Sequence, residues 1–124
     1  MTQILSLPPV SGALNFVADA DWRTKVAFAN FGVAVDLTGV AFRAQMRVTP
    51  IDSVIWLDLS TALGGLNNGG VTGVLGLFAP AAQTRFVPPG AYVLDIVAEA
   101  DGAVINLCGG APFTVTVSQG VTIP

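Results

Sequence analysis

The side chains that most often carry out chemistry are scarce in this sequence. Histidine is absent, which removes the commonest general base and the commonest metal ligand. Lys25 is the sole lysine, and no serine precedes it at the Ser-x-x-Lys spacing that would activate a serine nucleophile. The sequence therefore predicts a protein that is not an enzyme, and nothing in it indicates a cofactor.

Two pairs of carboxylates stand two residues apart, Asp19 with Asp21 and Glu99 with Asp101. Two acids within roughly 5 to 9.5 Å could hydrolyse a glycosidic bond, and an Asp-x-Asp segment could offer two oxygens to calcium, which needs about six or more. Both pairs lie beside expected turns, where aspartate commonly accepts hydrogen bonds from backbone amides. Turn capping is the favoured interpretation, and no metal site is predicted.

Cys108 is the only cysteine, so the chain forms no internal disulfide and implies no oxidising compartment. No basic residue stands near it in the sequence to lower its pKa. We expect Cys108 to be a small buried hydrophobic residue.

Arg43 and Arg47 fall on the same face of an expected strand, on either side of Gln45. They could form a basic patch. Because acidic residues outnumber basic ones, cross-strand pairing with carboxylates is favoured. The candidate partners are Asp58, Asp95 and Glu99.

Three aromatic side chains, Trp22, Trp56 and Tyr92, could stack on a sugar ring. Such residues are more often core residues or interface anchors, and Trp22 is a candidate interface residue. A carbohydrate-binding or adhesion module remains an alternative, and it requires one of these rings to stand in an exposed groove.

The composition indicates a protein whose surface faces other chains. Of its 124 residues, 52% are hydrophobic and only 10% are charged, whereas typical soluble domains carry roughly 25% charged residues. Five basic and eight acidic residues give a net charge of −3, which argues against a nucleic-acid partner because phosphate binding needs clustered Lys and Arg. The longest uncharged stretch, residues 59–84, contains several glycines and Pro80, so no membrane span or targeting segment is expected.

Alternating apolar and polar residues predict short strands throughout the chain. Over residues 40–48 the predicted inward positions are Val40, Phe42, Ala44, Met46 and Val48. The eight expected strands cover residues 14–17, 24–29, 40–48, 54–59, 74–78, 92–98, 103–107 and 112–118.

Turn residues separate these strands, and Asp101-Gly102 is a strong hairpin signal. Further turns are expected at residues 30–32, 36–39, 67–70 and 88–90, and a helical turn is expected within residues 79–86. The pattern predicts an all-β fold, a single antiparallel β-sandwich of about eight strands that occupies residues 1–124 as one domain.

Three segments resemble small virion proteins of tailed bacteriophages. Asp36-Leu37-Thr38-Gly39, followed by Phe42-Arg43-Ala44-Gln45-Met46-Arg47, is similar to a turn and strand in the amino-terminal domain of phage baseplate upper proteins. Pro88-Pro89-Gly90-Ala91-Tyr92-Val93-Leu94-Asp95 resembles their later Pro-Gly-x-Tyr-x-x-Asp strand entry, and Gly120-Val121-Thr122 fits their ends. The resemblance covers residues 14–122, and unlike in the longer relatives, no fibre or receptor-binding region is expected after the domain.

The resemblance implies an immunoglobulin-like β-sandwich located in a virion, where other virion proteins and further copies of the same chain are its partners. An assembly or attachment module of the tail, baseplate or fibre-anchoring region is the leading expectation. A capsid decoration (cement) protein is the main alternative.

Both ends of the chain lack charge, since no charged side chain stands in residues 1–18 or 102–124. Free termini are usually polar and solvated, and an apolar arm in water or an uncharged sheet edge invites pairing with another chain. We expect an apolar N-terminal arm (residues 1–13), and we expect its first ten residues or the segment 115–124 to pack against a neighbouring subunit. Besides Trp22, the candidate interface residues are Ile4, Leu5, Leu7, Val10, Val121 and Ile123.

Overall fold

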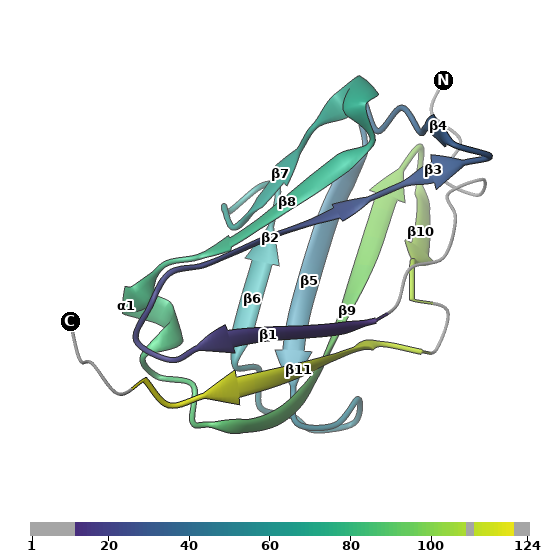
Figure 1. Cartoon of the computed structure of the whole chain (residues 1–124). Coiled ribbons are helices and arrows are strands. Elements are labelled where there is room, and N and C mark those ends of the chain that lie inside the picture. Colours follow the sequence, from purple (N-terminus) through teal and green to yellow (C-terminus); the bar gives the residue numbers. More distant parts are fainter. Residues whose placement is uncertain (1–11, 109–110, 121–124) are drawn as a thin grey trace.

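The computed structural model describes residues 12–108 and 111–120, and its strands form two main sheets and a small hairpin (Figure 1). The larger sheet has the strand order β1-β11-β9-β5-β6, with β10 pairing on β9. Its strands are β1 (Ala13–Val17), β5 (Ala41–Arg47), β6 (Leu57–Ser60), β9 (Gly90–Ala100), β10 (Ala103–Asn106) and β11 (Phe113–Ser118). The all-β prediction is confirmed.

The smaller sheet has the order β2-β8-β7. Its strands are β2 (Trp22–Ala27), β7 (Leu66–Asn68) and β8 (Val74–Ala79). A separate hairpin joins β3 (Ala29–Asn30) to β4 (Val33–Ala34), a short 3₁₀ helix spans Gly70–Thr72, and the only α-helix of the described residues is α1 (Ala81–Thr84). The predicted helical turn after Pro80 is thus confirmed.

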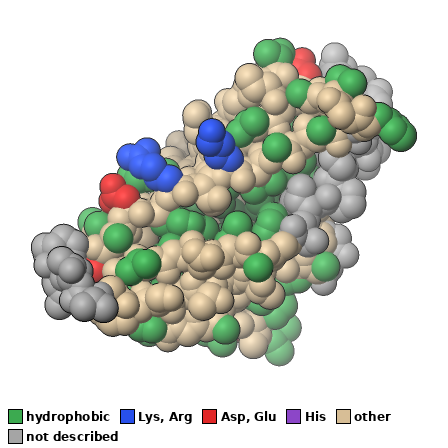
Figure 2. Space-filling view, in the orientation of Figure 1, with side chains coloured by type: hydrophobic (Ala, Val, Ile, Leu, Met, Phe, Trp, Pro, Cys, Tyr) green, Lys and Arg blue, Asp and Glu red, His purple; other side chains and the backbone are tan. Residues whose placement is uncertain are grey.

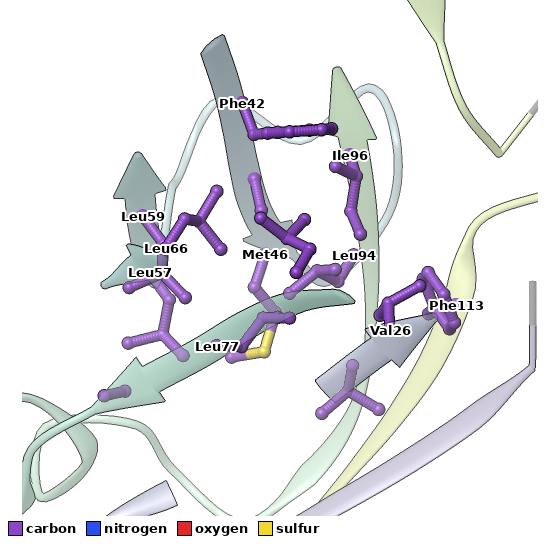
Figure 3. Packing of buried hydrophobic residues seen from close by; sticks show 14 of the residues in the cluster. Val26, Phe42, Met46, Leu57, Leu59, Leu66, Leu77, Leu94, Ile96 and Phe113 are labelled. Atoms are coloured by element: carbon purple, nitrogen blue, oxygen red, sulfur yellow. The ribbon is translucent and has the colours of Figure 1, made fainter. Parts of the chain in front are cut away.

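Both sheets contribute to one hydrophobic core (Figure 3). On β5 and β9 the predicted inward residues Phe42, Met46, Leu94 and Ile96 are almost fully buried. Leu77 of the smaller sheet belongs to the same cluster. Side chains on a strand alternate between its two faces, so these buried residues all point into the space between the sheets.

The Asp101-Gly102 hairpin is confirmed. Ala100 pairs with Ala103 across the turn, and both turn residues have positive φ angles, 52° and 79°. Glycine adopts this backbone without a steric penalty, and aspartate tolerates it better than most residues. The turn residues therefore determine the register of β9 against β10.

One pairing departs from the antiparallel prediction, because β1 runs parallel to β11. The chain passes from β1 in the larger sheet to β2 in the smaller sheet, so these consecutive strands form no hairpin. β1 pairs instead with the last strand, which runs in the same direction.

Three other strand predictions were wrong in part. Val48 was expected in the core, but β5 ends at Arg47 and Val48 is 45% exposed. The strand expected at 24–29 is interrupted at Phe28, whose N–H donates to the Gly73 carbonyl oxygen and whose carbonyl accepts from Val35 N–H. The strand expected at 54–59 is formed only from Leu57.

Strand β7 was not predicted, since Asn67 and Asn68 were expected in a turn. The Asn68 side chain donates from Nδ2 to the carbonyl oxygens of Leu37 and Val40, both at 2.8 Å. These partners lie about thirty residues away along the chain, so a local propensity rule could not anticipate this strand.

Candidate functional site

The predicted carboxylate pair at Asp19 and Asp21 holds a turn in place. Asp21 Oδ1 accepts a hydrogen bond of 2.8 Å from the N–H of Ala81, at the start of α1. Asp19 lies in the left-handed region (φ 67°) and forms an ion pair with Arg85, with 3.3 Å between Oδ1 and Nε. Asp21 therefore caps a backbone amide, as the turn-capping interpretation predicted, whereas Asp19 pairs with the Arg85 side chain instead.

Cys108 is buried, as expected for a small hydrophobic residue. Burial raises the pKa of its thiol, so the reactive thiolate is rarer at neutral pH than for a free cysteine. In the described part of the chain, no group of three or more His, Cys, Asp or Glu residues is placed to hold a metal ion.

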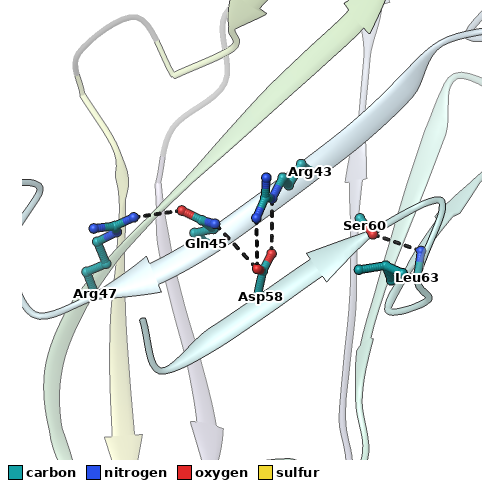
Figure 4. A network of polar contacts seen from close by, with 6 residues as sticks. All are labelled: Arg43, Gln45, Arg47, Asp58, Ser60 and Leu63. Atoms are coloured by element: carbon teal, nitrogen blue, oxygen red, sulfur yellow. Dashed lines mark hydrogen bonds and ion pairs between the residues drawn. The ribbon is translucent and has the colours of Figure 1, made fainter. Parts of the chain in front are cut away.

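A polar network crosses the outer face of the larger sheet (Figure 4). Arg43 binds Asp58 through two hydrogen bonds, Nε to Oδ1 at 3.2 Å and Nη2 to Oδ2 at 3.0 Å. This guanidinium holds the pKa of the Asp58 carboxyl below its usual value. The predicted pairing of Arg43 with a carboxylate is confirmed.

Arg47 does not follow that prediction. Its Nη1 donates to the carbonyl oxygen of Asp52 at 2.6 Å and its Nη2 donates to Gln45 Oε1 at 2.9 Å. The loop between β5 and β6 folds back over Arg47, and a backbone oxygen takes the place of the expected carboxylate.

A hollow of about 470 Å³ lies on this face, between β5, β9 and the segment after β10. The polar groups in its wall bind one another, since Asn106 Nδ2 donates to Asp95 Oδ2 at 2.8 Å and Arg47 is held as described above. Its lining therefore offers few free donors to a ligand.

The aromatic candidates for sugar stacking are turned away from the surface. Trp22 is only 4% exposed and stacks on Phe16 with 4.7 Å between ring centroids. Tyr92 is buried, and Trp56, which is half-buried, packs edge-on against it. The assignment of Trp22 as an interface residue was wrong, because the inward face of β2 places its ring in the core of its own chain.

The other candidate interface residues, Ile4, Leu5, Leu7, Val10, Val121 and Ile123, lie outside the described residues. The expected arm is described only from Gly12 onwards, and its residue Ala13 begins β1.

The structure instead exposes apolar side chains that the sequence analysis did not select. Phe31 is fully exposed at the tip of the β3–β4 hairpin, which projects from the molecule, and Val33 on the same hairpin is also exposed (Figure 1). Phe31 has a positive φ of 53°, in the turn that the sequence predicted. A large apolar residue between Asn30 and Gly32 is unusual for a solvated turn. This feature of the sequence could have identified Phe31 as an exposed apolar residue. The other exposed large hydrophobic residues of the described part are Val17, Val48, Ile51, Val54, Ile55, Leu63, Val71, Phe86 and Val104.

No helix in the described part of the chain combines the length and the apolar character needed to cross a bilayer. The uncharged stretch 59–84 forms the end of β6, β7, the 3₁₀ helix, β8, α1 and turns.

Comparison with known proteins gives a fold likeness without a family. No protein-family model and no curated protein matches this sequence. Among solved structures, the chain is similar to an endo-β-1,4-mannanase from Thermotoga petrophila, with a TM-score of 0.51 and 7% sequence identity. The match covers 87% of this chain but only 18% of the mannanase chain, so the likeness concerns the fold of a small part of that enzyme.

Proposed function

We propose that this chain is a non-enzymatic structural component of a tailed-phage virion, an assembly or attachment module of the tail, baseplate or fibre-anchoring region with an immunoglobulin-like β-sandwich fold. The observation that carries the proposal is the projecting β3–β4 hairpin, with Phe31 fully exposed and Val33 beside it. Contact with another protein would remove these side chains from water, which is favourable in proportion to the apolar area buried.

The finer fold assignment is supported by strand order and by one hydrogen bond. The orders β1-β11-β9-β5-β6 and β2-β8-β7 distribute the strands over two sheets, as in immunoglobulin-like domains. Tyr92, near the start of β9, donates from its hydroxyl to the carbonyl oxygen of Pro88 at 2.6 Å. This bond resembles the tyrosine corner of immunoglobulin domains, where a tyrosine bonds back to the preceding corner of the chain.

Two of the segments that resemble phage proteins have structural roles consistent with that fold. Asp36 Oδ1 accepts hydrogen bonds from the N–H and the hydroxyl of Thr38, and Leu37 between them is fully buried. The turn leads directly into β5. The second segment contains the Tyr92–Pro88 bond. The resemblance therefore rests on residues that shape the domain.

The charge distribution supports contact rather than catalysis as the role of the surface. The molecule exposes 7018 Å² and carries only five basic and eight acidic residues. Two of the acids, Asp19 and Asp58, are paired with arginines. Weak charge and exposed apolar residues together favour partners among other virion proteins, including further copies of this chain, and favour neither nucleic acid nor membrane.

A capsid decoration protein is the second candidate, because the same surface would serve it equally well. The two candidates differ in symmetry. A tail component forms a closed ring around the tail axis, whereas a decoration protein follows the sites of the capsid lattice.

The test is to locate the chain in intact particles by electron cryomicroscopy, with an epitope tag at its C-terminus and an antibody fragment as the label. Label at the tail or baseplate in a closed ring supports the proposal. Label distributed over the capsid supports the decoration protein, and particles that contain no label overturn both.

A further inference from the structure

Some charged side chains of this protein have no hydrogen bond or ion pair among the described residues. All five basic and all eight acidic residues lie within residues 19–101, which the structure describes. Most of them form an ion pair or bind a backbone or amide group. The exceptions are two basic residues of β2 and two acidic residues of the β9–β10 hairpin, Arg23, Lys25, Glu99 and Asp101.

The two basic side chains line a hollow on the outer face of the smaller sheet. Its volume is about 600 Å³, and no acidic residue of the described part stands in its wall. The guanidinium of Arg23 lies over the ring of Phe78, 4.2 Å from the ring centroid, which holds it above the sheet. Figure 2 shows basic side chains near one another over this sheet. The hollow therefore combines positive charge with apolar side chains such as Val74 and suits an anionic partner.

Gly76 lies in this hollow, between its strand partners Lys25 of β2 and Asn67 of β7. Its φ angle is not in the left-handed region, and both ladders run past it without a bulge. A Cβ at this position would lie 3.7 Å from the Cβ of Asn67, which is an ordinary contact. Glycine weakens the interior of a strand and often marks the close approach of a ligand or another backbone. Since the strand itself does not require glycine here, Gly76 indicates the approach of an incoming segment.

The two acidic side chains stand at an exposed hairpin end. Glu99 is an exposed residue near the end of β9, and Asp101 is the first residue of the turn to β10. No atom of the described residues lies within 4 Å of a Cβ built at Gly102, so the turn projects into open space. Val104, directly opposite Glu99, is 64% exposed. The turn thus presents negative charge and an apolar side chain on a narrow loop.

Charge favours contact between these two surfaces. The segments outside the described residues, 1–11, 109–110 and 121–124, contain no charged side chain, so none of their side chains can neutralise Arg23 or Lys25. Two hollows that face each other would bring basic side chains together, and two turns would bring acidic side chains together. Like charges opposite each other are destabilising, whereas a turn that meets a hollow brings opposite charges together.

We propose that the β9–β10 turn of one copy of this chain docks in the hollow over Gly76 of a second copy, so that the two unpaired acids meet the two unpaired bases. This proposal deepens the structural function proposed above and rests on it. Because two different surfaces meet, the contact can repeat from copy to copy and close into a ring, the arrangement expected of a tail component. Exposed ion pairs add little affinity. The charges therefore determine which surfaces meet, and burial of apolar side chains such as Val104 stabilises the contact.

Carbodiimide crosslinking tests this contact, because Lys25 is the sole lysine. The reagent joins a lysine amine to a carboxylate that touches it, with net loss of water. Equal amounts of unlabelled and ¹⁵N-labelled chain are mixed, crosslinked at high concentration and digested, and the joined peptides are identified by mass spectrometry. We expect Lys25 of one label to be joined to Glu99 or Asp101 of the other. Lys25→Arg keeps the charge but removes the amine, so it is the matched control and should give no such peptide.

Exchange of charge between the two surfaces gives a second test, measured by sedimentation velocity. Arg23→Glu with Lys25→Glu makes the hollow acidic. Glu99→Lys with Asp101→Asn makes the turn basic and keeps a residue suited to its backbone. We expect each double variant alone to associate about tenfold or more weakly than the original chain. A mixture of the two should regain association, because every contact between them is again complementary.

Gly76→Val tests the shape of the hollow without a change of charge. The added side chain should fill the space over the strand and weaken association by about tenfold, since excess volume in a packed contact is destabilising. The melting temperature should not fall, because valine is favoured in strands and glycine is not. Thr116→Val on the exposed face of β11 is the matched control and should leave association unchanged.

Three outcomes overturn the inference. Lys25 can be joined to neither acid of the turn. It can be joined to Glu99 or Asp101 only within one label, which assigns the contact to a single chain. The mixture of double variants can stay as weakly associated as each alone, which means that these charges do not meet.

Location in particles is measured separately, so the two proposals fail in different ways. A chain that occupies the tail but gives no mixed-label peptide overturns this inference alone. A chain that gives the peptide but is absent from particles overturns the proposed function alone.

Discussion

At the scale of single residues, polar side chains in this protein hold turns against distant segments. Thr84 of α1 is completely buried, and its hydroxyl donates to the carbonyl oxygen of Ala20 at 2.7 Å. Asp21 binds the backbone of the same helix. The turn between β1 and β2 is thus attached to α1 by two side chains. Groups of the kind that sequence reasoning would examine for catalysis are used here to satisfy backbone donors and acceptors.

Replacement of Thr84 by valine is expected to destabilise the fold. Thr84→Val keeps the shape but removes the hydroxyl, so the Ala20 carbonyl loses its donor, at a cost of about 1 to 3 kcal/mol. Chemical denaturation followed by tryptophan fluorescence measures this. Thr116→Val on the exposed face of β11 is the matched control and should change stability little. Equal effects of the two substitutions would contradict the role of the buried hydroxyl.

The Arg43–Asp58 pair should make stability depend on acid pH. The pKa of Asp58 lies below its ordinary value of 3.8 in the folded chain, chiefly because Arg43 donates hydrogen bonds to the carboxylate. The pair's contribution to the free energy of unfolding is therefore complete above the pKa of Asp58 in the unfolded chain. It is lost as the pH falls through the lower pKa of Asp58 in the folded chain. Asp58→Asn should cost less than about 1 kcal/mol at neutral pH, since the pair is exposed.

Thermal unfolding of the Asp58→Asn variant and the original chain across acid pH measures this dependence. The difference in melting temperature should shrink as the pH falls, because the original carboxyl also becomes neutral. A difference that stays constant down to the acid limit would show that charge is not its cause.

At the scale of elements, the two-residue turns and the core-facing strands determine how β9 is positioned. β9 pairs with β5 on one side and with β10 and β11 on the other. Its inward residues include Tyr92, Leu94, Ile96 and Ala98, all buried. A shift of one residue would turn all of them to the opposite face, so the core and the Asp101-Gly102 turn specify the same register.

Leu94→Ala is expected to destabilise the chain by about 2 to 5 kcal/mol, because the side chain is 1% exposed and its loss leaves a cavity. The free energy of unfolding from denaturant titration measures this. Val104→Ala on the adjoining strand, where the side chain is largely exposed, should cost much less. An unchanged melting temperature for Leu94→Ala would mean that the register of β9 is wrong.

Gly102→Ala isolates the effect of backbone conformation. No atom lies within 4 Å of a Cβ built at Gly102, so alanine meets no steric contact there. Its φ of 79° remains unfavourable for an L-residue, by about 1 to 2 kcal/mol. Asp101→Asn, which retains a residue suited to this turn, is the control and should be neutral in the same denaturation experiment. A neutral Gly102→Ala would contradict the turn geometry.

At the scale of the whole molecule, the surface combines weak charge with a projecting apolar hairpin. The hairpin is attached to the smaller sheet through Phe28, which is buried and bonded to Gly73 and Val35. Phe31 therefore stands on a base that belongs to the core, while its own ring contacts water. Such an arrangement can lose the exposed ring without loss of the fold.

Phe31→Ser together with Val33→Ser should leave the melting temperature within a few degrees of the original and should reduce the amount of chain incorporated into particles. Quantitative immunoblotting of purified particles measures this occupancy. Leu63→Ser, which removes an exposed apolar side chain in the turn after β6, is the matched control away from the hairpin tip. Unchanged occupancy of the double variant would show that the hairpin is not the contact with the particle.

Local sequence pattern determined which residues point inwards and where several turns lie. The alternation over Phe42, Ala44 and Met46 and the Asp101-Gly102 turn were predicted without knowledge of the fold, because side-chain direction in a strand and φ tolerance in a turn are properties of a few adjacent residues. The ion pair of Arg43 was predicted only as one of several possibilities, since charge alone does not say which strands are neighbours.

Tertiary structure alone decided the pairing partners and therefore the surface. The parallel contact of β1 with β11, the strand formed by Asn68 and the burial of Trp22 all depend on residues far apart in the sequence. The exposure of Phe31 has the same origin. Burial is a property of the assembled sheets, because an apolar side chain is covered only where another element happens to lie against it.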